Sequence, residues 1–305
     1  MTEAALALAV NDVIDGFTVI RVLDTKQPSR TFLVRRSLNA EDIVLKLSRP
    51  ESREAEVLQQ VSHSGVCQLL GQGGDSANPY LLLSNYGQRT LQNCVEQGIA
   101  IKTLADVLLQ IAAALDALHA SGFAHGDVRP EHILVTPNQQ AVLIDLHCAY
   151  HLAGQTQNIP YDGASLAYLS PERIRAGLLD EDLPLTGASD YYSLGITVFQ
   201  MLSGELPFAE DAPELLVQSH LNDQTPKLPS HLQAFQGLVD GLLKKEADQR
   251  IACLAEVRDA LGSISGDFQL SRRVIRSSAI GTQELSASFA DLRLRPDELA
   301  KRNKR

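Results

Sequence analysis

Two aspartates, Asp127 and Asp145, have the surroundings in this chain that most clearly suit chemistry. Asp127 lies in segment 125–135, which is predicted to form a loop between two short strands, and Asp145 follows the next predicted strand. Two carboxylates brought together in this way suit phosphoryl transfer. One can orient and deprotonate an attacking hydroxyl, while the other holds a metal ion that neutralises phosphate charge.

The sequence HGDVRPEH at 125–132, followed by IDLH at 144–147, resembles the H-R-D-x-x-x-x-N and D-F-G motifs of protein kinases. The resemblance implies that Asp127 is the catalytic base and that Asp145 is a metal ligand. Arg129 stands where the family has lysine, and it is implied to be catalytic. It keeps a positive charge near the transferring phosphate, although its planar fork is not equivalent to an ammonium group.

The implied metal site departs from the family pattern. The family's second metal ligand is asparagine, whereas position 132 of this chain is histidine. Imidazole suits softer ions better than Mg²⁺, so a site made of Asp145 and His132, with His147 as a third donor, shifts the preference towards Mn²⁺. In the alternative, His132 hydrogen-bonds Asp127 or Asp145 in a metal-free site. Both alternatives remain open at this point.

Further segments resemble the same family and follow one another in the family's order. Residues 43–46 correspond to the strand with the phosphate-binding lysine, 53–58 to the helix with its partner glutamate, and 80–91 to the hinge. Residues 164–172 correspond to the end of the activation segment, 189–195 with 202–208 to the helix that buttresses the catalytic loop, and 244–250 to the segment with a late arginine. Six ordered matches between residues 16 and 264 argue against chance. The chain resembles the bacterial, eukaryotic-like (Hanks-type) Ser/Thr protein kinases, as a diverged member.

The resemblance implies ATP as a cofactor, together with Mg²⁺ or Mn²⁺. Lys46 is implied to reach the α- and β-phosphates and to be braced by Glu54. Glu56 or Glu51 are alternative partners, because the interval after the lysine is short for the family. Leu83 takes the gatekeeper position. The other positions implied to line the nucleotide site are Leu23, Thr31, Val44, Ser84, Tyr86 and Leu134.

The loop expected to cover the phosphates, at 23–31, is degenerate. It lacks all three expected glycines, which would let the backbone approach phosphate closely. Pro28 stiffens this loop and Asp24 repels phosphate, whereas Lys26 and Arg30 attract it. Val44 replaces the family's alanine and crowds the adenine base. We therefore expect ATP binding to be weak or absent.

Three functions follow from these residues. The first is ATP-dependent phosphoryl transfer to Ser or Thr of a protein substrate, slow or atypical in its use of metal; Ser165, at the substrate-threonine position, fits this acceptor. The second is a catalytically inactive pseudokinase that acts as a binding or regulatory scaffold. The third is a small-molecule phosphotransferase, because His-Gly-Asp at 125–127 also occurs in such enzymes. The retained lysine and aspartates favour the first function.

Other positions of the resemblance carry structural or regulatory roles. Glu172 and Arg250 are implied to form a buried ion pair, and Asp190 is implied to cap the catalytic loop from below. The small-molecule kinases lack the segments that hold Glu172 and Asp190. Gly126 replaces the arginine that would grip a phosphorylated activation segment, so we expect less control by phosphorylation of that segment.

The predicted fold is α+β and two-lobed, with a small antiparallel β N-lobe and a mainly helical C-lobe. Alternating residues at 16–47 predict three strands, and helical spacing is found at 50–61 and 104–119. A turn at 137–140 places His132 and Asp145 near each other. The predicted organisation is an N-terminal extension at 1–15, a kinase-like domain at 16–264 (N-lobe 16–83, hinge 84–90, C-lobe 91–264) and a basic tail at 265–305.

Composition limits the partners and the compartment. The chain has 27 Lys and Arg against 37 Asp and Glu; residues 271–305 hold 9 against 4 of these, which makes the tail basic and the body acidic. The tail is expected to dock on its own domain or on an acidic partner, or else to be a solvated end. No nucleic acid is expected as a partner. Four scattered cysteines predict free thiols, and the absence of a long apolar run predicts a cytoplasmic protein without a membrane anchor.

Overall fold

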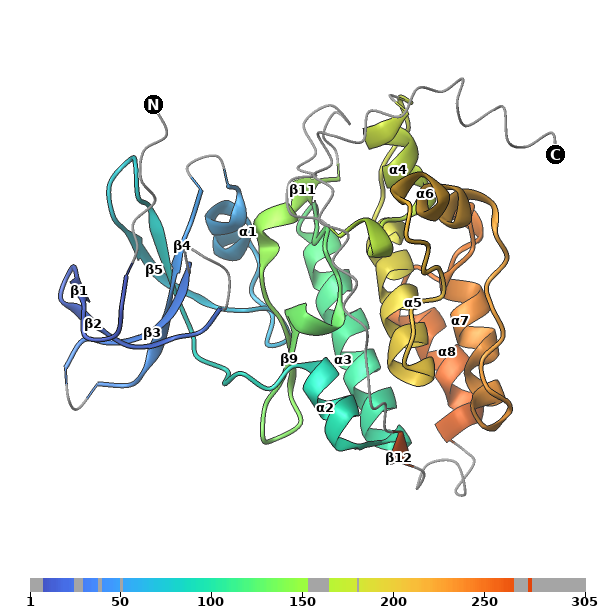
Figure 1. The fold of residues 1–305 in the computed structure, drawn as a ribbon, viewed down its shortest axis with the longest axis horizontal. Coiled ribbons are helices and arrows are strands. Elements are labelled where there is room, and N and C mark those ends of the chain that lie inside the picture. Colours follow the sequence, from blue (N-terminus) through green and yellow to red (C-terminus); the bar gives the residue numbers. More distant parts are fainter. Residues whose placement is uncertain are drawn as a thin grey trace.

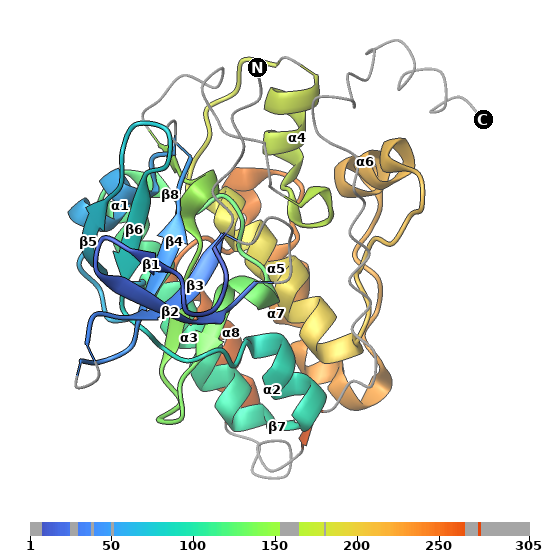
Figure 2. The same cartoon turned by 60° about the vertical axis from the view of Figure 1, so that its left-hand side comes forward.

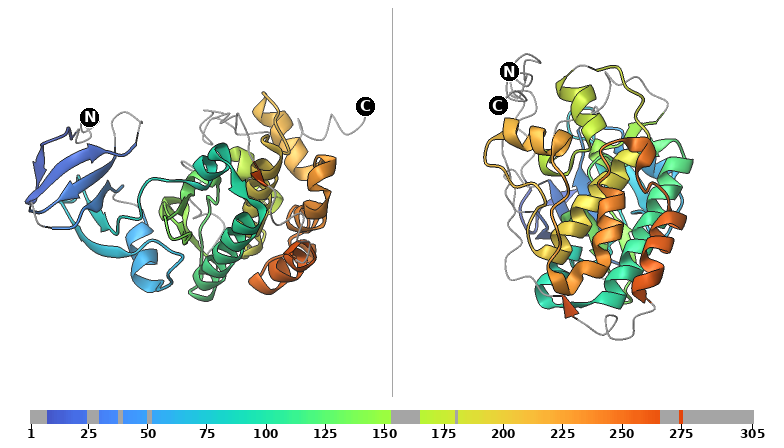
Figure 3. Two further views of the ribbon diagram at one scale, coloured as in Figure 1. Left: turned by 90° about the horizontal axis from the view of Figure 1, so that it is seen from below. Right: turned by 90° about the vertical axis from the view of Figure 1, so that its right-hand side faces the viewer.

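The computed structural model describes residues 8–24, 30–37, 40–49, 52–152, 165–179, 181–265 and 274–275. These residues form two lobes, a small one built on an antiparallel sheet and a larger one built mainly from helices (Figure 1). The two lobes are joined by the segment between β6 and α2, where the hinge was predicted (Figure 3). The predicted α+β, two-lobed fold is confirmed.

The small lobe contains one six-stranded sheet with the order β1-β2-β3-β4-β6-β5 and antiparallel neighbours throughout. In β2, Phe17 and Val19 are buried while Thr18 and Ile20 are not, as the alternating sequence predicts. The strands are β1 (Val13–Ile14), β2 (Phe17–Val22), β3 (Thr31–Arg35), β4 (Ile43–Leu47), β5 (Leu69–Gly73) and β6 (Tyr80–Leu83).

The helix of the small lobe, α1 (Glu54–Gln60), is shorter than the predicted 50–61. The hydroxyl of Ser52 accepts the backbone N–H of Glu54 over 3.2 Å, so the chain is still turning before the helix begins. Figure 2 shows α1 beside β5, against which it packs. The short helix places Glu54 in its first turn, facing β4.

The large lobe is organised around α3 (Ile101–Ala120), whose apolar residues are buried as the helical spacing predicts. It packs against α8, while α5 packs against α7 (Figure 3). The other helices are α2 (Leu91–Gln97), α4 (Pro171–Leu178), α5 (Ala188–Ser203), α6 (Pro213–Asn222), α7 (Gln236–Leu242) and α8 (Leu254–Ser265), with short 3₁₀ turns at η1 (Pro130–His132), η2 (Leu146–Cys148), η4 (Leu166–Tyr168), η5 (Ser230–Phe235) and η6 (Ala247–Gln249).

Three two-stranded ribbons complete the large lobe: β8 (Phe123–Ala124) with β11 (Tyr150–His151), β9 (Ile133–Val135) with β10 (Ala141–Leu143), and β7 (Ile99–Ala100) with β12 (Val274–Ile275). The turn of the β9–β10 ribbon includes the predicted 137–140. His132 precedes β9 and Asp145 follows β10, so this ribbon brings the two residues to the same end. The β12 strand attaches part of the C-terminal segment to the large lobe.

The predicted pair of Glu172 and Arg250 is present. Two guanidinium nitrogens of Arg250 donate to the two carboxylate oxygens of Glu172 over 2.7 and 3.0 Å, and the Arg250 side chain has no exposed surface. This two-point contact joins the start of α4 to the segment before α8. The four cysteines are free, and no helix in the described ranges is long and apolar enough to cross a membrane.

Candidate active site

The loop that carries Asp127 is held from below by the carboxylate of Asp190 in α5. The backbone N–H groups of His125 and Gly126 donate to this carboxylate over 2.8 and 2.9 Å, and the Nε2 of His119 lies 2.8 Å from it. Burial alone would raise the pKa of Asp190, but His119 and the loop outweigh burial and lower it. Asp190 therefore stays ionised and fixes the start of the loop.

Asp127 is only 2 % exposed. Its Oδ1 accepts the backbone N–H of Ser165 over 3.3 Å, while its Oδ2 lies 3.2 Å from Nδ1 of His132 and 4.0 Å from Nε of Arg129. Burial alone would raise the pKa of Asp127, but His132 and Arg129 outweigh burial and lower it to about 2. The carboxylate is therefore ionised at neutral pH, which is the state that accepts a proton.

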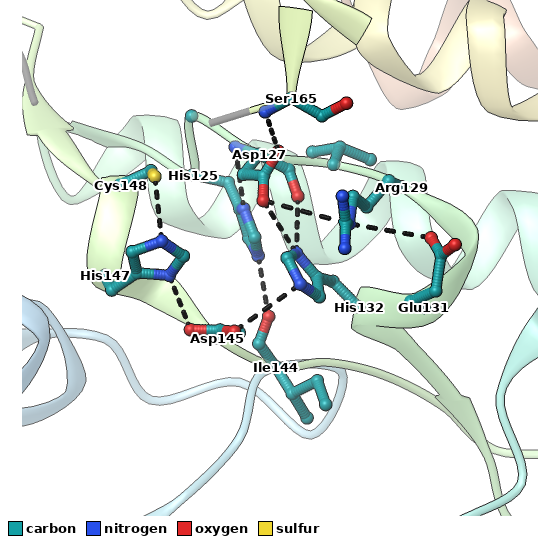
Figure 4. A network of polar contacts seen from close by, with 12 residues as sticks. His125, Asp127, Arg129, Glu131, His132, Ile144, Asp145, His147, Cys148 and Ser165 are labelled. Carbon is teal, nitrogen blue, oxygen red and sulfur yellow. Dashed lines mark hydrogen bonds and ion pairs between the residues drawn. The ribbon is translucent and has the colours of Figure 1, made fainter. Parts of the chain in front are cut away.

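The ring of His132 lies between the two aspartates (Figure 4). Its Nδ1 donates to the backbone carbonyl of Asp127 over 2.9 Å, and its Nε2 lies 3.4 Å from Oδ2 of Asp145. Burial alone would lower the pKa of His132, but Asp127 and Asp145 outweigh burial and raise it. The imidazole thus links the two carboxylates that the sequence predicted to work together.

Asp145 has a left-handed backbone, with φ 66° and ψ 64°. Aspartate tolerates this conformation better than most residues, yet it still carries strain of about 1–3 kcal/mol. The side chain is held on both oxygens. Oδ1 contacts Nζ of Lys46 at 2.5 Å and Nδ1 of His147 at 2.6 Å, and Oδ2 faces His132. These contacts compensate the strain and keep the carboxylate in one orientation.

Lys46 pairs with Glu54. Its Nζ lies 2.8 and 2.6 Å from the two oxygens of Glu54, which is 1 % exposed. Of the alternatives, Glu56 faces His151 at 3.2 Å, and Glu51 lies outside the described residues. Oε1 of Glu54 also accepts the N–H of Leu146 over 3.1 Å, so the same carboxylate contacts the residue after Asp145.

The donor set near Asp145 fits a divalent cation that accepts imidazole. Oδ2 of Asp145 and Nε2 of His132 face each other, and the bond from Nδ1 to the Asp127 carbonyl leaves Nε2 as the nitrogen available to a metal. Metal binding there would release a proton from the ring. No group of three or more His, Cys, Asp or Glu in the described part of the chain is arranged to hold a metal, so phosphate and water would supply the remaining ligands.

The positions expected to line the nucleotide site come from both lobes and from the segment between them. Val44 lies opposite Leu83 across β4 and β6, and Thr31 lies opposite Lys46 across β3 and β4. The N–H of Leu23 donates to the carbonyl of Thr31 over 2.9 Å. Ser84 and Tyr86 lie in the connecting segment, and Leu134 lies in β9 of the large lobe.

The phosphate-covering loop is described only at its ends, because residues 25–29 lie outside the described residues. At the base of this loop, Oδ2 of Asp24 accepts the N–H of Arg30 over 2.8 Å. The guanidinium of Arg30 donates to the carbonyls of Leu47 and Ser48. Of the three charged side chains expected to act on phosphate, Asp24 is bonded to the backbone just before β3 and Arg30 to the backbone at the end of β4, while Lys26 lies outside the described residues.

Glu131 and Cys148, for which no role was predicted, both lie in this network (Figure 4). Oε2 of Glu131 lies 3.5 Å from Nε of Arg129, and Sγ of Cys148 lies 3.2 Å from Nε2 of His147. The contact between Arg129 and Glu131 could have been predicted from their two-residue spacing around Pro130. Nothing in the sequence pattern marked the second.

Residues 19–260 match the protein kinase domain family. The chain is 26 % identical over 288 residues to the serine/threonine-protein kinase PksC of Streptomyces coelicolor, covering 87 % of this chain and 47 % of that protein. It is 28 % identical over 253 residues to the serine/threonine-protein kinase PknB of Mycolicibacterium smegmatis, covering 78 % of this chain and 39 % of that protein. The chain thus spans about half or less of the length of these relatives.

Among solved structures, the chain is similar to the kinase PK-1 of Cydia pomonella granulovirus, with a TM-score of 0.66 and 19 % identity. The likeness covers 80 % of this chain and 94 % of the viral protein, and at this identity it concerns the fold. The family match is independent of that likeness and extends over most of the sequence. The chain belongs to the protein kinase family.

Proposed function

We propose that the chain transfers the γ-phosphoryl group of ATP to a serine or threonine hydroxyl of a protein substrate. The observation that carries this proposal is one continuous polar network from the small lobe to the catalytic loop. Its members are, in order, Glu54, Lys46, Asp145, His132 and Asp127. A fold used only for binding has no physical need to keep a lysine and two carboxylates in such a network.

In the proposed reaction, the substrate oxygen forms a bond to the γ-phosphorus while the bond from phosphorus to the β–γ bridging oxygen breaks. The hydroxyl proton passes to the carboxylate of Asp127. Because the pKa of Asp127 is about 2, this transfer occurs late, and the earlier contribution of the carboxylate is to orient the hydroxyl. Arg129, beside Asp127, places a permanent positive charge near the transferring group.

Lys46 would hold the α- and β-phosphates while Glu54 fixes its ammonium group. Asp145 and His132 would hold a divalent cation, which supplies neutralisation of phosphate charge when bound. The imidazole ligand favours Mn²⁺ over Mg²⁺. His132 also contacts Asp127, so the residue that would bind the metal is the one that orients the base.

Transfer of phosphate from γ-labelled ATP to a generic protein acceptor tests the proposal. Asp127→Asn preserves size and hydrogen bonding but removes the base, so the rate should fall by about 10²–10⁴-fold. Asp106→Asn, an exposed carboxylate of α3, is the matched control and should keep the parental rate. Transfer by Asp127→Asn at the parental rate would place the chemistry at another site.

A second candidate, a binding scaffold without turnover, is favoured by one feature of Asp127. Its Oδ1 accepts the backbone N–H of Ser165, so a substrate hydroxyl that approaches this oxygen must compete with Ser165; its Oδ2 accepts no hydrogen bond from the described residues and lies 3.2 Å from Nδ1 of His132. The scaffold predicts no transfer by the parent protein and partner binding that is unchanged in Asp127→Asn. A protein that shows no thermal shift at millimolar ATP with Mg²⁺, Mn²⁺ or no metal would leave only this candidate.

A further inference from the structure

Arg173, the third residue of α4, is a buried arginine that the site described above does not use. It is 1 % exposed and is one of the largest fully buried side chains in the described residues. Its Nη1 donates to the backbone carbonyl of Gly126, and its guanidinium carbon lies 5.2 Å from the ring centroid of Tyr150. Burying an arginine is costly unless its charge and N–H groups are used, so these contacts call for an explanation.

The two contacts connect three separate segments. Gly126 belongs to the catalytic loop, immediately before Asp127. Tyr150 belongs to β11, which pairs with β8, and Ala124 of β8 lies opposite Tyr150. Ala176, one turn after Arg173, packs in the same apolar cluster as Ala124 and Tyr150. One face of α4 therefore rests on the β8–β11 ribbon, and Arg173 extends from that face to the loop.

The bond to Gly126 acts on the peptide unit that places Asp127. The N–H of Gly126 is held by Asp190 over 2.9 Å. The next peptide unit consists of the carbonyl of Gly126 and the N–H of Asp127. Arg173 donates to this carbonyl, and the N–H donates to Nδ1 of His125 over 3.3 Å, a weaker contact. Without the arginine, this unit keeps only the longer of its two bonds.

The loop cannot obtain this support from a side chain at position 126. Gly126 has φ +81°, and a Cβ added there would lie 2.2 Å from the carbonyl oxygen of Cys148. The space around this backbone is closed by the segment that runs from Asp145 to β11. A brace for the Gly126 carbonyl must therefore come from another element, and α4 provides it.

We propose that Arg173 is a positioning residue for Asp127: its guanidinium fixes the Gly126–Asp127 peptide and joins it to β11 and α4. The catalytic consequence rests on the proposed function, whereas the brace itself does not. A planar guanidinium bonds the carbonyl and stacks on Tyr150 at the same time, which an ammonium group cannot do equally well. This brace needs no phosphorylated residue, because only the side chains of Arg173 and Tyr150 take part in it.

Amide hydrogen exchange of peptides covering 125–127 tests the brace without any need for activity. Arg173→Met should speed exchange there by about tenfold, because a buried carbonyl loses its charged donor. Arg175→Met, which removes the same charge from the same helix, is the matched control and should leave exchange at 125–127 unchanged. Equal exchange in the two variants would overturn the proposal.

Kinetics tests the catalytic consequence in the full chain. A shift of the base should lower kcat of Arg173→Met by at least about tenfold with KM for ATP unchanged, and Arg173→Lys should recover part of that loss. A change in KM alone would overturn the positioning role. If the parent protein transfers no phosphate, the proposed function fails while the exchange measurement still decides the brace. If Arg173→Met does not fold, Arg173→Lys and Tyr150→Leu take its place. Each should speed exchange at 125–127, and exchange at the parental rate would contradict the proposal.

Discussion

The Nζ of Lys46 in β4 lies 2.5 Å from Oδ1 of Asp145, a residue 99 positions further along the chain. Burial alone would lower the pKa of Lys46, but Asp145 and Glu54 outweigh burial and raise it above its ordinary value. The lysine therefore carries a full charge between two carboxylates. Because Lys46 belongs to the small lobe and Asp145 follows a ribbon of the large lobe, this ion pair holds the two lobes against each other.

Lys46→Met should weaken nucleotide binding, since the ammonium is the group expected to meet the phosphates. For the parent protein, ATP at a hundredfold excess over Kd would stabilise the fold by about 2.7 kcal/mol. Thermal unfolding with and without ATP measures the difference. Lys102→Met, which removes an exposed lysine of α3, should retain the parental shift. An equal shift in Lys46→Met and the parent would mean that ATP does not contact this lysine.

His132→Asn should change the metal preference of ATP binding. The parent should bind ATP more tightly with Mn²⁺ than with Mg²⁺, whereas an asparagine oxygen should raise affinity with Mg²⁺. Isothermal titration with each metal measures this preference. His151→Asn replaces a more exposed histidine and serves as the control. A preference that is the same in the parent and in His132→Asn would remove His132 from the metal site.

Arg250→Ala should destabilise the fold by about 3–5 kcal/mol, because Glu172 would remain buried without its partner. Arg35→Ala breaks the exposed ion pair with Asp42, which water screens, and should cost far less stability than Arg250→Ala. Denaturant unfolding of both variants measures the contrast. Similar losses would show that the Glu172–Arg250 pair contributes no more than a surface contact.

The stability of the parent should fall as the pH drops below about 4.5, in part through Glu172. Burial alone would raise the pKa of Glu172, but Arg250 outweighs burial and holds the pKa below its ordinary value of 4.5. The unfolded chain therefore takes up this proton at higher pH than the folded chain. The contribution is present above the ordinary value and is lost as the pH falls through the folded value. Unfolding of Glu172→Gln across this range should show a shallower fall, and an unchanged slope would exclude Glu172 as a source.

Ile275→Ala should loosen the contact between β12 and β7. Ile275 is 7 % exposed and lies opposite Ile99, whereas its neighbour Val274 is 60 % exposed and provides the matched control as Val274→Ala. Amide hydrogen exchange of peptides covering 99–100 should become faster in Ile275→Ala and stay unchanged in Val274→Ala.

Backbone pairing and apolar burial hold β12 on β7, so added salt should have little effect on exchange in the parent protein. Residues 266–273 and 276–305 of the basic tail, for which ionic docking was expected, lie outside the described residues.

The architecture was predictable because its signals are periodic and repeated along the chain. Alternation in β2 and the helical spacing of α3 each depend on burial of one face, which many residues report together. The residue at which α1 begins was harder to predict from the sequence. Ser52 turns the backbone just before Glu54, and a single side-chain bond of this kind leaves no periodic trace.

The contacts within the site depend on atomic geometry that residue types do not determine. The sequence left His132 as a metal ligand or as a partner of the aspartates, because both uses require the same ring and differ only in its orientation. It also left three glutamates as partners of Lys46. The two-residue strand β12 is too short for an alternating pattern, and Arg173 lies in no motif whose spacing would predict its burial.

The conformation of Gly126 limits which side chains this position can carry. Any residue with a side chain would require a Cβ 2.2 Å from the carbonyl oxygen of Cys148. A substitution here cannot be accommodated in place; the backbone around Cys148 would have to move first. Because Arg173 donates to the carbonyl of the same glycine, such a backbone movement would also disturb the bond that holds this peptide unit to α4.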